Sequence, residues 1–204
     1  ALSTANLGVL SSTQVGAINA KSVAGLTTTQ LGALNTAQAA GLSSGQVGAL
    51  SSTQVAGLST AVGAGLSTTQ VASISAKAVA GLTTAQVGAL TTTQEAALSS
   101  TQIAGLTTAQ LGAFSTDKAA ALTTTQVAAL SSTQIGALNT ANLALLTSDK
   151  IAALNSKSVA GLTTAQLGVL TTAQAAGLSS GQIGALSSTQ LAALSTAVVA
   201  GLST

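Results

Sequence analysis

The few ionisable side chains are the first place to look for chemistry in this sequence. Of 204 residues, five are Lys and three are acidic. The acids, Glu95, Asp117 and Asp149, lie far apart along the chain. General acid–base catalysis needs two such groups to converge on one cleft. We therefore expect no catalytic residues and a protein that is not an enzyme.

The residue types needed for other kinds of site are missing. Cys and His are absent, so the usual ligands of zinc, haem and iron–sulfur clusters do not occur. A Ser–His or Cys–His nucleophile pair cannot form either. We expect neither a metal site nor a cofactor-binding site. Nucleic-acid binding is also not expected, because there is one aromatic residue, Phe114, and the lysines are dispersed: Lys21, Lys77, Lys118, Lys150 and Lys157.

An eight-residue repeat, here called the octad, runs through the whole chain without insertion or deletion. Position 1 recurs from Leu2 to Leu202 and is always Leu, except at Ile18, Ile74 and Phe114. The consensus is L-[STN]-[ST]-x-Q-[VIL]-[AG]-[AG], as in residues 82–89. A repeat at a fixed period is typical of solenoid proteins, in which each repeat buries its apolar face against neighbours.

Each octad carries the signals of a helix start. Position 2 is always Ser, Thr or Asn, which are favoured N-cap residues. Gln three residues later completes a capping box, and apolar residues at positions 1 and 6 form a hydrophobic staple. In one continuous helix the Leu positions would drift by roughly 80° per octad, so they could share no core. The pattern instead predicts one helix of about six residues per octad.

We therefore predict an all-α repeat solenoid built from very short N-capped helices, one per octad. A β-solenoid is the alternative, because Thr, Val and Ile also favour strands and β-helices are built from short repeats too. That alternative leaves the N-cap residues and the Gln unexplained. Isolated helices this short are unstable in water, so each must be held by its neighbours.

Several octad positions carry further expectations. Position 7 is Ala or Gly in every complete octad, which suggests close backbone approach at the corner or between coils. Lysines at position 4, and the pairs Asp117–Lys118 and Asp149–Lys150 at positions 4 and 5, are expected on a solvated outer face. Glu95 occupies position 6, so we expect that this position is not fully buried in every octad.

A longer period overlies the octad. Residues 18–68 match residues 154–204, an offset of 136 residues; for example, residues 42–46 (LSSGQ) recur at 178–182. We interpret residues 1–204 as a single continuous octapeptide-repeat array. Because neither end has the atypical polar cap of a finite solenoid, we expect the array to be a segment of a longer one.

The Ser and Thr residues at positions 2 and 3 form a regular series of hydroxyl groups. Such a series is suited to binding ice or a glycan surface, but helix capping and hydrogen bonding between coils explain it more simply. No stretch reaches the ~18 consecutive apolar residues of a transmembrane helix. With a net charge of +2 and 4% charged residues, the chain is expected to associate with itself.

The repeat, as in residues 82–89, resembles low-complexity octapeptide-repeat regions of very large bacterial secreted or cell-surface proteins of the adhesin-like kind. The resemblance implies an extracellular or cell-surface location and a structural or adhesive role. Our leading hypothesis is a structural protein that forms a filament, sheath or stalk by self-association. The alternative is an adhesin, or a rod that binds ice or glycans through its Ser and Thr residues.

Overall fold

The protein is a succession of very short helices with no strand between residues 3 and 202, which are the residues that the computed structural model describes. There is one helix per octad, as the sequence predicts, and the β-solenoid alternative is wrong. The chain forms two compact units, Ala1–Leu106 and Thr107–Thr204. The octad continues through this boundary unchanged, so no feature of the repeat marks it.

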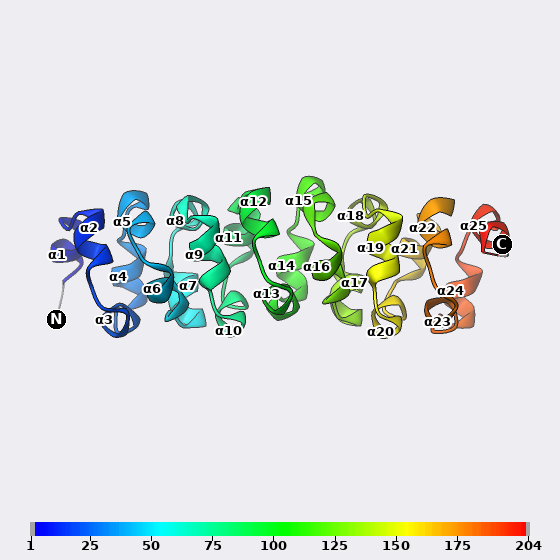
Figure 1. The fold of residues 1–204 in the computed structure, drawn as a ribbon, viewed down its shortest axis with the longest axis horizontal. Helices are drawn as coiled ribbons and strands as arrows, with labels where there is room; N and C mark the ends of the chain where they lie inside the picture. Colours follow the sequence, from blue (N-terminus) through cyan, green and yellow to red (C-terminus); the bar gives the residue numbers. More distant parts are fainter. Residues whose placement is uncertain (1–2, 203–204) are drawn as a thin grey trace. The chain divides into compact units, whose positions relative to one another are not determined.

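The helices have four to six residues each and are labelled in Figure 1. In the first unit they are α1 (Thr4–Gly8), α2 (Ser12–Gly16), α3 (Ala20–Ala24), α4 (Thr28–Gly32), α5 (Thr36–Ala40), α6 (Ser44–Gly48), α7 (Ser52–Gly57), α8 (Thr60–Gly65), α9 (Thr68–Ser73), α10 (Ala76–Val79), α11 (Thr84–Ala89), α12 (Thr92–Ala96) and α13 (Ser100–Gly105).

In the second unit they are α14 (Thr108–Gly112), α15 (Thr116–Ala121), α16 (Thr124–Ala128), α17 (Ser132–Ala137), α18 (Thr140–Ala144), α19 (Ser148–Ala153), α20 (Ser156–Val159), α21 (Thr164–Gly168), α22 (Thr172–Ala176), α23 (Ser180–Ile183), α24 (Ser188–Ala192) and α25 (Thr196–Gly201).

Each helix begins at the residue that the sequence predicts. At α11, the Thr83 hydroxyl accepts a hydrogen bond from the backbone N–H of Gln86 at 3.1 Å. In return, Gln86 Oε1 accepts from the backbone N–H of Thr83 at 2.7 Å. This capping box recurs in most of the helices and satisfies two donors that a helix N-terminus otherwise leaves free.

The corner between two helices is formed by extended residues. Leu58 ends α7 with φ −67° and ψ 142°, and the next N-cap, Ser59, is extended as well. No residue between 3 and 202 has a positive φ. The glycines at positions 7 and 8 are therefore not needed for a left-handed turn, and their role lies elsewhere.

Within each unit, every helix packs against the third helix along the chain. In the first unit the contacts run from α1 with α4 to α10 with α13, and in the second from α14 with α17 to α22 with α25. One turn of the coil is therefore three octads, or 24 residues. The stacking of short helices on successive turns can be followed in each unit in Figure 1. Within each unit, the fold is thus an all-α solenoid.

The octad positions divide cleanly between interior and surface. The side chains at positions 1, 5 and 6 are buried in most octads, whereas positions 2, 3 and 4 face outward. Leu at position 1 and Val, Ile or Leu at position 6 form the apolar core of each unit. Burial of these side chains is the main favourable contribution to folding.

Two of our expectations for charged residues are wrong. Glu95, at position 6, has 1% of its surface exposed, and Lys118, at position 5, has 5% exposed. Position within the octad decides burial here, since stacked turns enclose positions 5 and 6 whichever residue occupies them. The acidic residues of the two pairs, Asp117 and Asp149, are both exposed, as predicted.

The expected close approach of backbones occurs between turns. A Cβ at Gly136, position 7 of α17, would lie 2.7 Å from the carbonyl oxygen of Gly161, one turn later. A Cβ at Gly161 would in turn overlap the carbonyl of Ser132. Real Cβ atoms do not approach a carbonyl oxygen so closely, so only Gly fits this stacking distance. The tightest contacts are made by glycines at position 8 as well as position 7.

Candidate functional site

The side chains at position 2 are occupied by helix capping. In every described helix except α19, the Ser, Thr or Asn there accepts from the backbone N–H three residues later, as Ser131 does from Gln134 at 3.2 Å. Several of these hydroxyls also hydrogen-bond to a Thr at position 4; Ser131 and Thr133 are 3.0 Å apart. These groups are committed within the helix, which favours the capping explanation over a ligand-binding one.

The hydroxyl groups at position 3 are differently placed. They belong to the first residue of each helix and mostly face outward. On stacked helices they follow one another from turn to turn, as Thr68 of α9 and Thr92 of α12 do, and both are exposed. Position 3 is therefore the place where a regular row of Ser and Thr residues meets the solvent.

The Gln at position 5 connects successive turns, a role that capping alone does not require. Gln86 Nε2 donates to the carbonyl oxygen of Val55 at 2.9 Å and to that of Leu58 at 2.6 Å. Val55 lies in α7 and Leu58 is its C-cap residue, so both carbonyls are at the end of an earlier helix, where most backbone acceptors lack helical partners. The Val55 carbonyl also accepts from the Leu58 backbone N–H at 3.2 Å. One side chain therefore caps the start of its own helix and the end of another.

The same arrangement recurs along both units, with the donor 31 and 28 residues after its two acceptors. We call these residues the amide ladder. Its members include Gln38, Gln46, Gln54, Gln70, Gln86, Gln94 and Gln102 in the first unit, and Gln166, Gln174, Gln182 and Gln190 in the second.

The amide ladder is a feature that the capping pattern did not predict, although the sequence contains a signal for it. Glu serves as well as Gln in a capping box. Yet no octad has Glu at position 5. A carboxylate cannot donate to a carbonyl oxygen, so the exclusion of Glu indicates a second task in which the side chain must donate.

Other residues at position 5 replace the amide only in part. Asn142 Nδ2 donates to the carbonyl of Phe114 at 2.9 Å, but its Oδ1 is buried without a hydrogen-bond partner. Ser158 Oγ donates to the carbonyl of Leu130, and Lys150 Nζ donates to that of Ala120. Each makes one bond to the earlier turn where Gln makes two or three.

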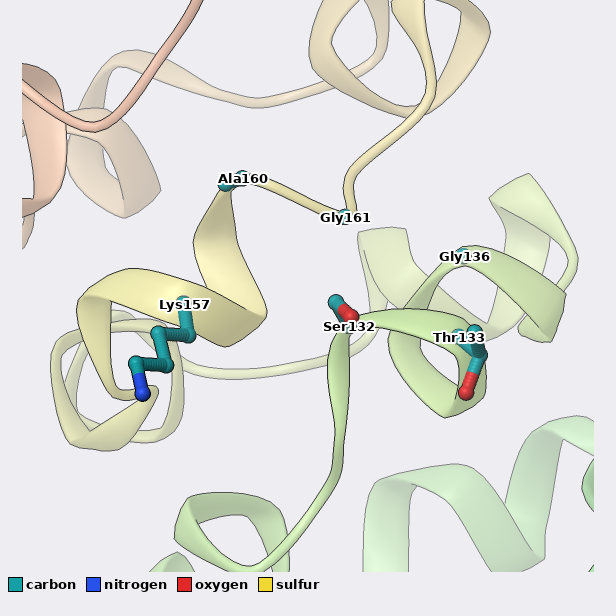
Figure 2. Close-up of a pocket in the computed structure, with 6 residues that line it drawn as sticks. All are labelled: Ser132, Thr133, Gly136, Lys157, Ala160 and Gly161. Carbon is teal, nitrogen blue, oxygen red and sulfur yellow. The ribbon is translucent and has the colours of Figure 1, made fainter.

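A surface hollow of about 440 Å³ lies between α17 and α20 in the second unit. Its lining includes Gly136 and Gly161, which have no side chains and lie at the close contact of the two turns. Figure 2 shows Ser132 and Thr133 on one side and Lys157 on the other, with the lysine side chain extending away from the hydroxyls. The hollow holds one cation and two hydroxyls that do not converge, so it offers no catalytic arrangement.

The remaining charged residues form no cluster. Lys21, Lys77 and Lys157 at position 4 are not buried, as predicted. Among residues 3–202 there is no group of three or more acidic residues close enough to hold a metal ion. Each described helix is also too short to cross a lipid bilayer, which takes ~20 residues.

Comparison with known proteins identifies the family of the repeat. No curated protein matches the chain. The family described as the ALTTAQ repeat matches residues 23–60, 64–92, 95–130, 120–156 and 148–180, which together are more than half of the chain. The six letters of the family's description correspond to position 8 of one octad through position 5 of the next, where this chain has Gly-Leu-Thr-Thr-Ala-Gln at residues 81–86 and Ala-Leu-Thr-Thr-Thr-Gln at residues 89–94, so the motif ends on the amide of the ladder. The chain belongs to the ALTTAQ repeat family.

Proposed function

We propose that this protein is a non-enzymatic structural protein that associates with itself into a filament, sheath or stalk outside the cell. The observation that carries the proposal is the nearly uncharged surface, made of hydroxyl groups at positions 2 to 4 and of small apolar residues at positions 7 and 8. Such a surface lacks the charge repulsion that keeps proteins apart in solution.

A specific apolar pair supports self-association. Leu145 and Val169 stand at position 8, where most octads have Ala or Gly, with 46% and 41% of their surfaces exposed. They follow α18 and α21, which contact each other on successive turns. Neighbouring exposed apolar side chains are typical of surfaces that meet a partner, and a second copy of the chain is the partner that we propose.

Sedimentation velocity and electron microscopy of the purified protein test the proposal. We expect the sedimentation coefficient to rise with concentration and elongated particles to appear in micrographs. A monodisperse monomer at all concentrations up to the millimolar range would contradict self-association. The extracellular location, which the resemblance to secreted repeat proteins implies, is tested by antibody labelling of intact source cells against permeabilised ones.

A matched pair of variants identifies the surface. In Leu145→Lys/Val169→Lys we expect weaker association, because two ammonium groups replace the apolar pair. The control, Ala141→Lys/Ala165→Lys, adds the same charge to the same helices at position 4, which is exposed and which carries Lys in other octads. Equal loss of association in both variants would indicate a general effect of charge rather than this surface.

The second candidate function is an adhesin, or a rod that binds ice or glycans, through the exposed hydroxyls at position 3. Replacing Ser44 by Ala, and Thr68 and Thr92 by Val, removes one hydroxyl from each of three successive turns. Loss of binding to ice or immobilised glycans, with the helical circular dichroism retained, would favour this function. Unchanged binding, or none in the starting protein, would reject it.

A further inference from the structure

The carbonyl oxygens at position 1 show how firmly successive turns of the first unit are joined. Those of Leu10, Ile18, Leu26, Leu42, Leu58, Leu66 and Ile74 each accept a hydrogen bond from the amide ladder. The carbonyl oxygens of Leu34 and Leu50 accept none from the described residues. Both leucines are buried, so these two carbonyls lack the hydrogen bonds that their equivalents make.

The cause lies 28 residues later in the sequence. The position-5 residue that would reach Leu34 is Val62, and the one that would reach Leu50 is Ala78. Both side chains are buried but have no donor. Their helices, α8 and α10, also lack the capping box, because the same missing Gln would have completed it.

The two position-5 residues without a donor, Val62 and Ala78, belong to the same turn of the coil. Of the three position-5 residues in residues 58–81, only Gln70 donates to the preceding turn, at the carbonyls of Ala39, Ala40 and Leu42. In the turn after it, residues 82–105, all three position-5 residues are Gln and all three donate to earlier residues. The same holds for residues 34–57.

The apolar contacts across this junction are retained, since α5 packs on α8, α6 on α9 and α7 on α10. The number of side-chain hydrogen bonds across the junction is what is reduced. A buried carbonyl without a donor regains hydrogen bonds to water when the turns part, which lowers the free energy of opening. In a solenoid each turn contacts only its neighbours, so a weak junction opens locally.

We propose that the junction between residues 34–57 and 58–81 is a built-in release point, at which the first unit opens before its other junctions and which the Gln70 side chain holds closed. Such a junction makes the coil extensible without unfolding the whole unit. The inference concerns a single chain and does not depend on filament formation.

The absence of Cys from the sequence allows a direct test by thiol labelling. Val71 and Val87 are buried at position 6 of α9 and α11, respectively. We expect the thiol of Val71→Cys to react with an aromatic disulfide reagent at least ten times faster than that of Val87→Cys, in the full chain under native conditions. Equal rates at the two sites would overturn the proposal.

Filling the gaps should close the junction. In Val62→Gln/Ala78→Gln we expect the labelling rate of the Val71→Cys thiol to fall to that of Val87→Cys. The two new amides would donate to the carbonyl oxygens of Leu34 and Leu50. An unchanged rate in the folded variant would overturn the proposal.

The converse change is expected to create a second release point. This test is independent of whether Val62→Gln/Ala78→Gln folds. Gln86→Val/Gln102→Ala removes two amide donors from the next turn, residues 82–105, and so reproduces there the absence of donors at Val62 and Ala78. We expect the Val87→Cys thiol to react about as fast as that of Val71→Cys, with helical circular dichroism retained. If the Val87→Cys rate stays low in this variant, missing donors do not cause release, and the proposal fails.

Discussion

Gln86 uses one side-chain amide for two tasks. Its oxygen accepts from the N-cap backbone, and its nitrogen donates to two carbonyls of an earlier turn. Only a side chain with both an acceptor and two donors, at the right length, completes all three bonds. Because the side chain is buried, each unmade bond costs more than it would at the surface.

The first prediction separates the two tasks of the amide. Gln86→Glu retains the oxygen that accepts from Thr83 but loses both donors and places a carboxylate in the interior. We expect the free energy of unfolding at pH 7 to fall by about 3 kcal/mol, measured by urea denaturation.

The matched control for that prediction is Gln14→Glu. Gln14 is exposed and makes its capping-box bonds with Ser11, without an inter-turn bond. Since Glu is a normal capping-box residue, we expect a change within about 0.5 kcal/mol. A similar loss of stability in both variants would show that the ladder adds little to capping.

The second prediction concerns the small residues at position 7. Gly136→Ala places a Cβ 2.7 Å from the Gly161 carbonyl oxygen, whereas Gly168→Ala places one 3.6 Å from that of Ala193, an ordinary contact. Ala favours helix over Gly by about 1 kcal/mol. We therefore expect Gly168→Ala to raise the midpoint of thermal unfolding and Gly136→Ala to lower it. A rise in both would mean that the turns can separate slightly at no cost.

At the scale of the single helix, the sequence predicts almost everything. Helices of four to six residues are far too short to be stable alone, so their ends must be specified by local signals. The position-2 cap and the Gln three residues later are local signals of this kind, and α11 begins where they predict. Hydrogen bonds of Gln between coils are expected from the sequence, but the acceptors of the amide ladder are not, because they lie 28 to 31 residues before the donor and no local pattern specifies that distance.

The third prediction is a stabilising change in one helix, α18. Asn142 is one methylene shorter than Gln, and α18 has no capping box. In Asn142→Gln we expect the side chain to reach both the Asn139 backbone N–H and a second carbonyl of the earlier turn. The free energy of unfolding should rise by about 1 kcal/mol, measured by urea denaturation. A decrease would indicate that nearby side chains leave no room for the longer amide.

At the scale of each unit, the similarity between octads prevents the sequence from predicting which helices stack on one another. Because every octad presents nearly the same residues, the pattern does not distinguish stacking on the third helix from stacking on the second or fourth. The burial of Glu95 and Lys118 follows from that stacking, so a prediction based on charge alone placed them wrongly. Position in the repeat outweighs the preference of a charged side chain for water at these two sites, although burying charge is costly.

The same similarity predicts which deletions the first unit tolerates. Removing residues 42–49 takes out one octad and leaves Leu50 directly after Gly41, so every remaining position keeps its place in the repeat. Gln54 then faces the carbonyls of Val15 and Ile18, which are the acceptors of the deleted Gln46. We expect the variant to keep its helical content per residue, with only a modest loss of stability, because solenoid stability is nearly a sum over repeats.

Removing residues 42–45 is a smaller deletion that we expect to be more damaging. It joins Gly41 to Gln46, which eliminates one buried Leu and one N-cap and shifts half an octad out of register. Circular dichroism and urea denaturation of the two variants provide the comparison. If the four-residue deletion is tolerated as well as the eight-residue one, the helices are not held in place by the octad register, and the coil must be able to accommodate helices of irregular spacing.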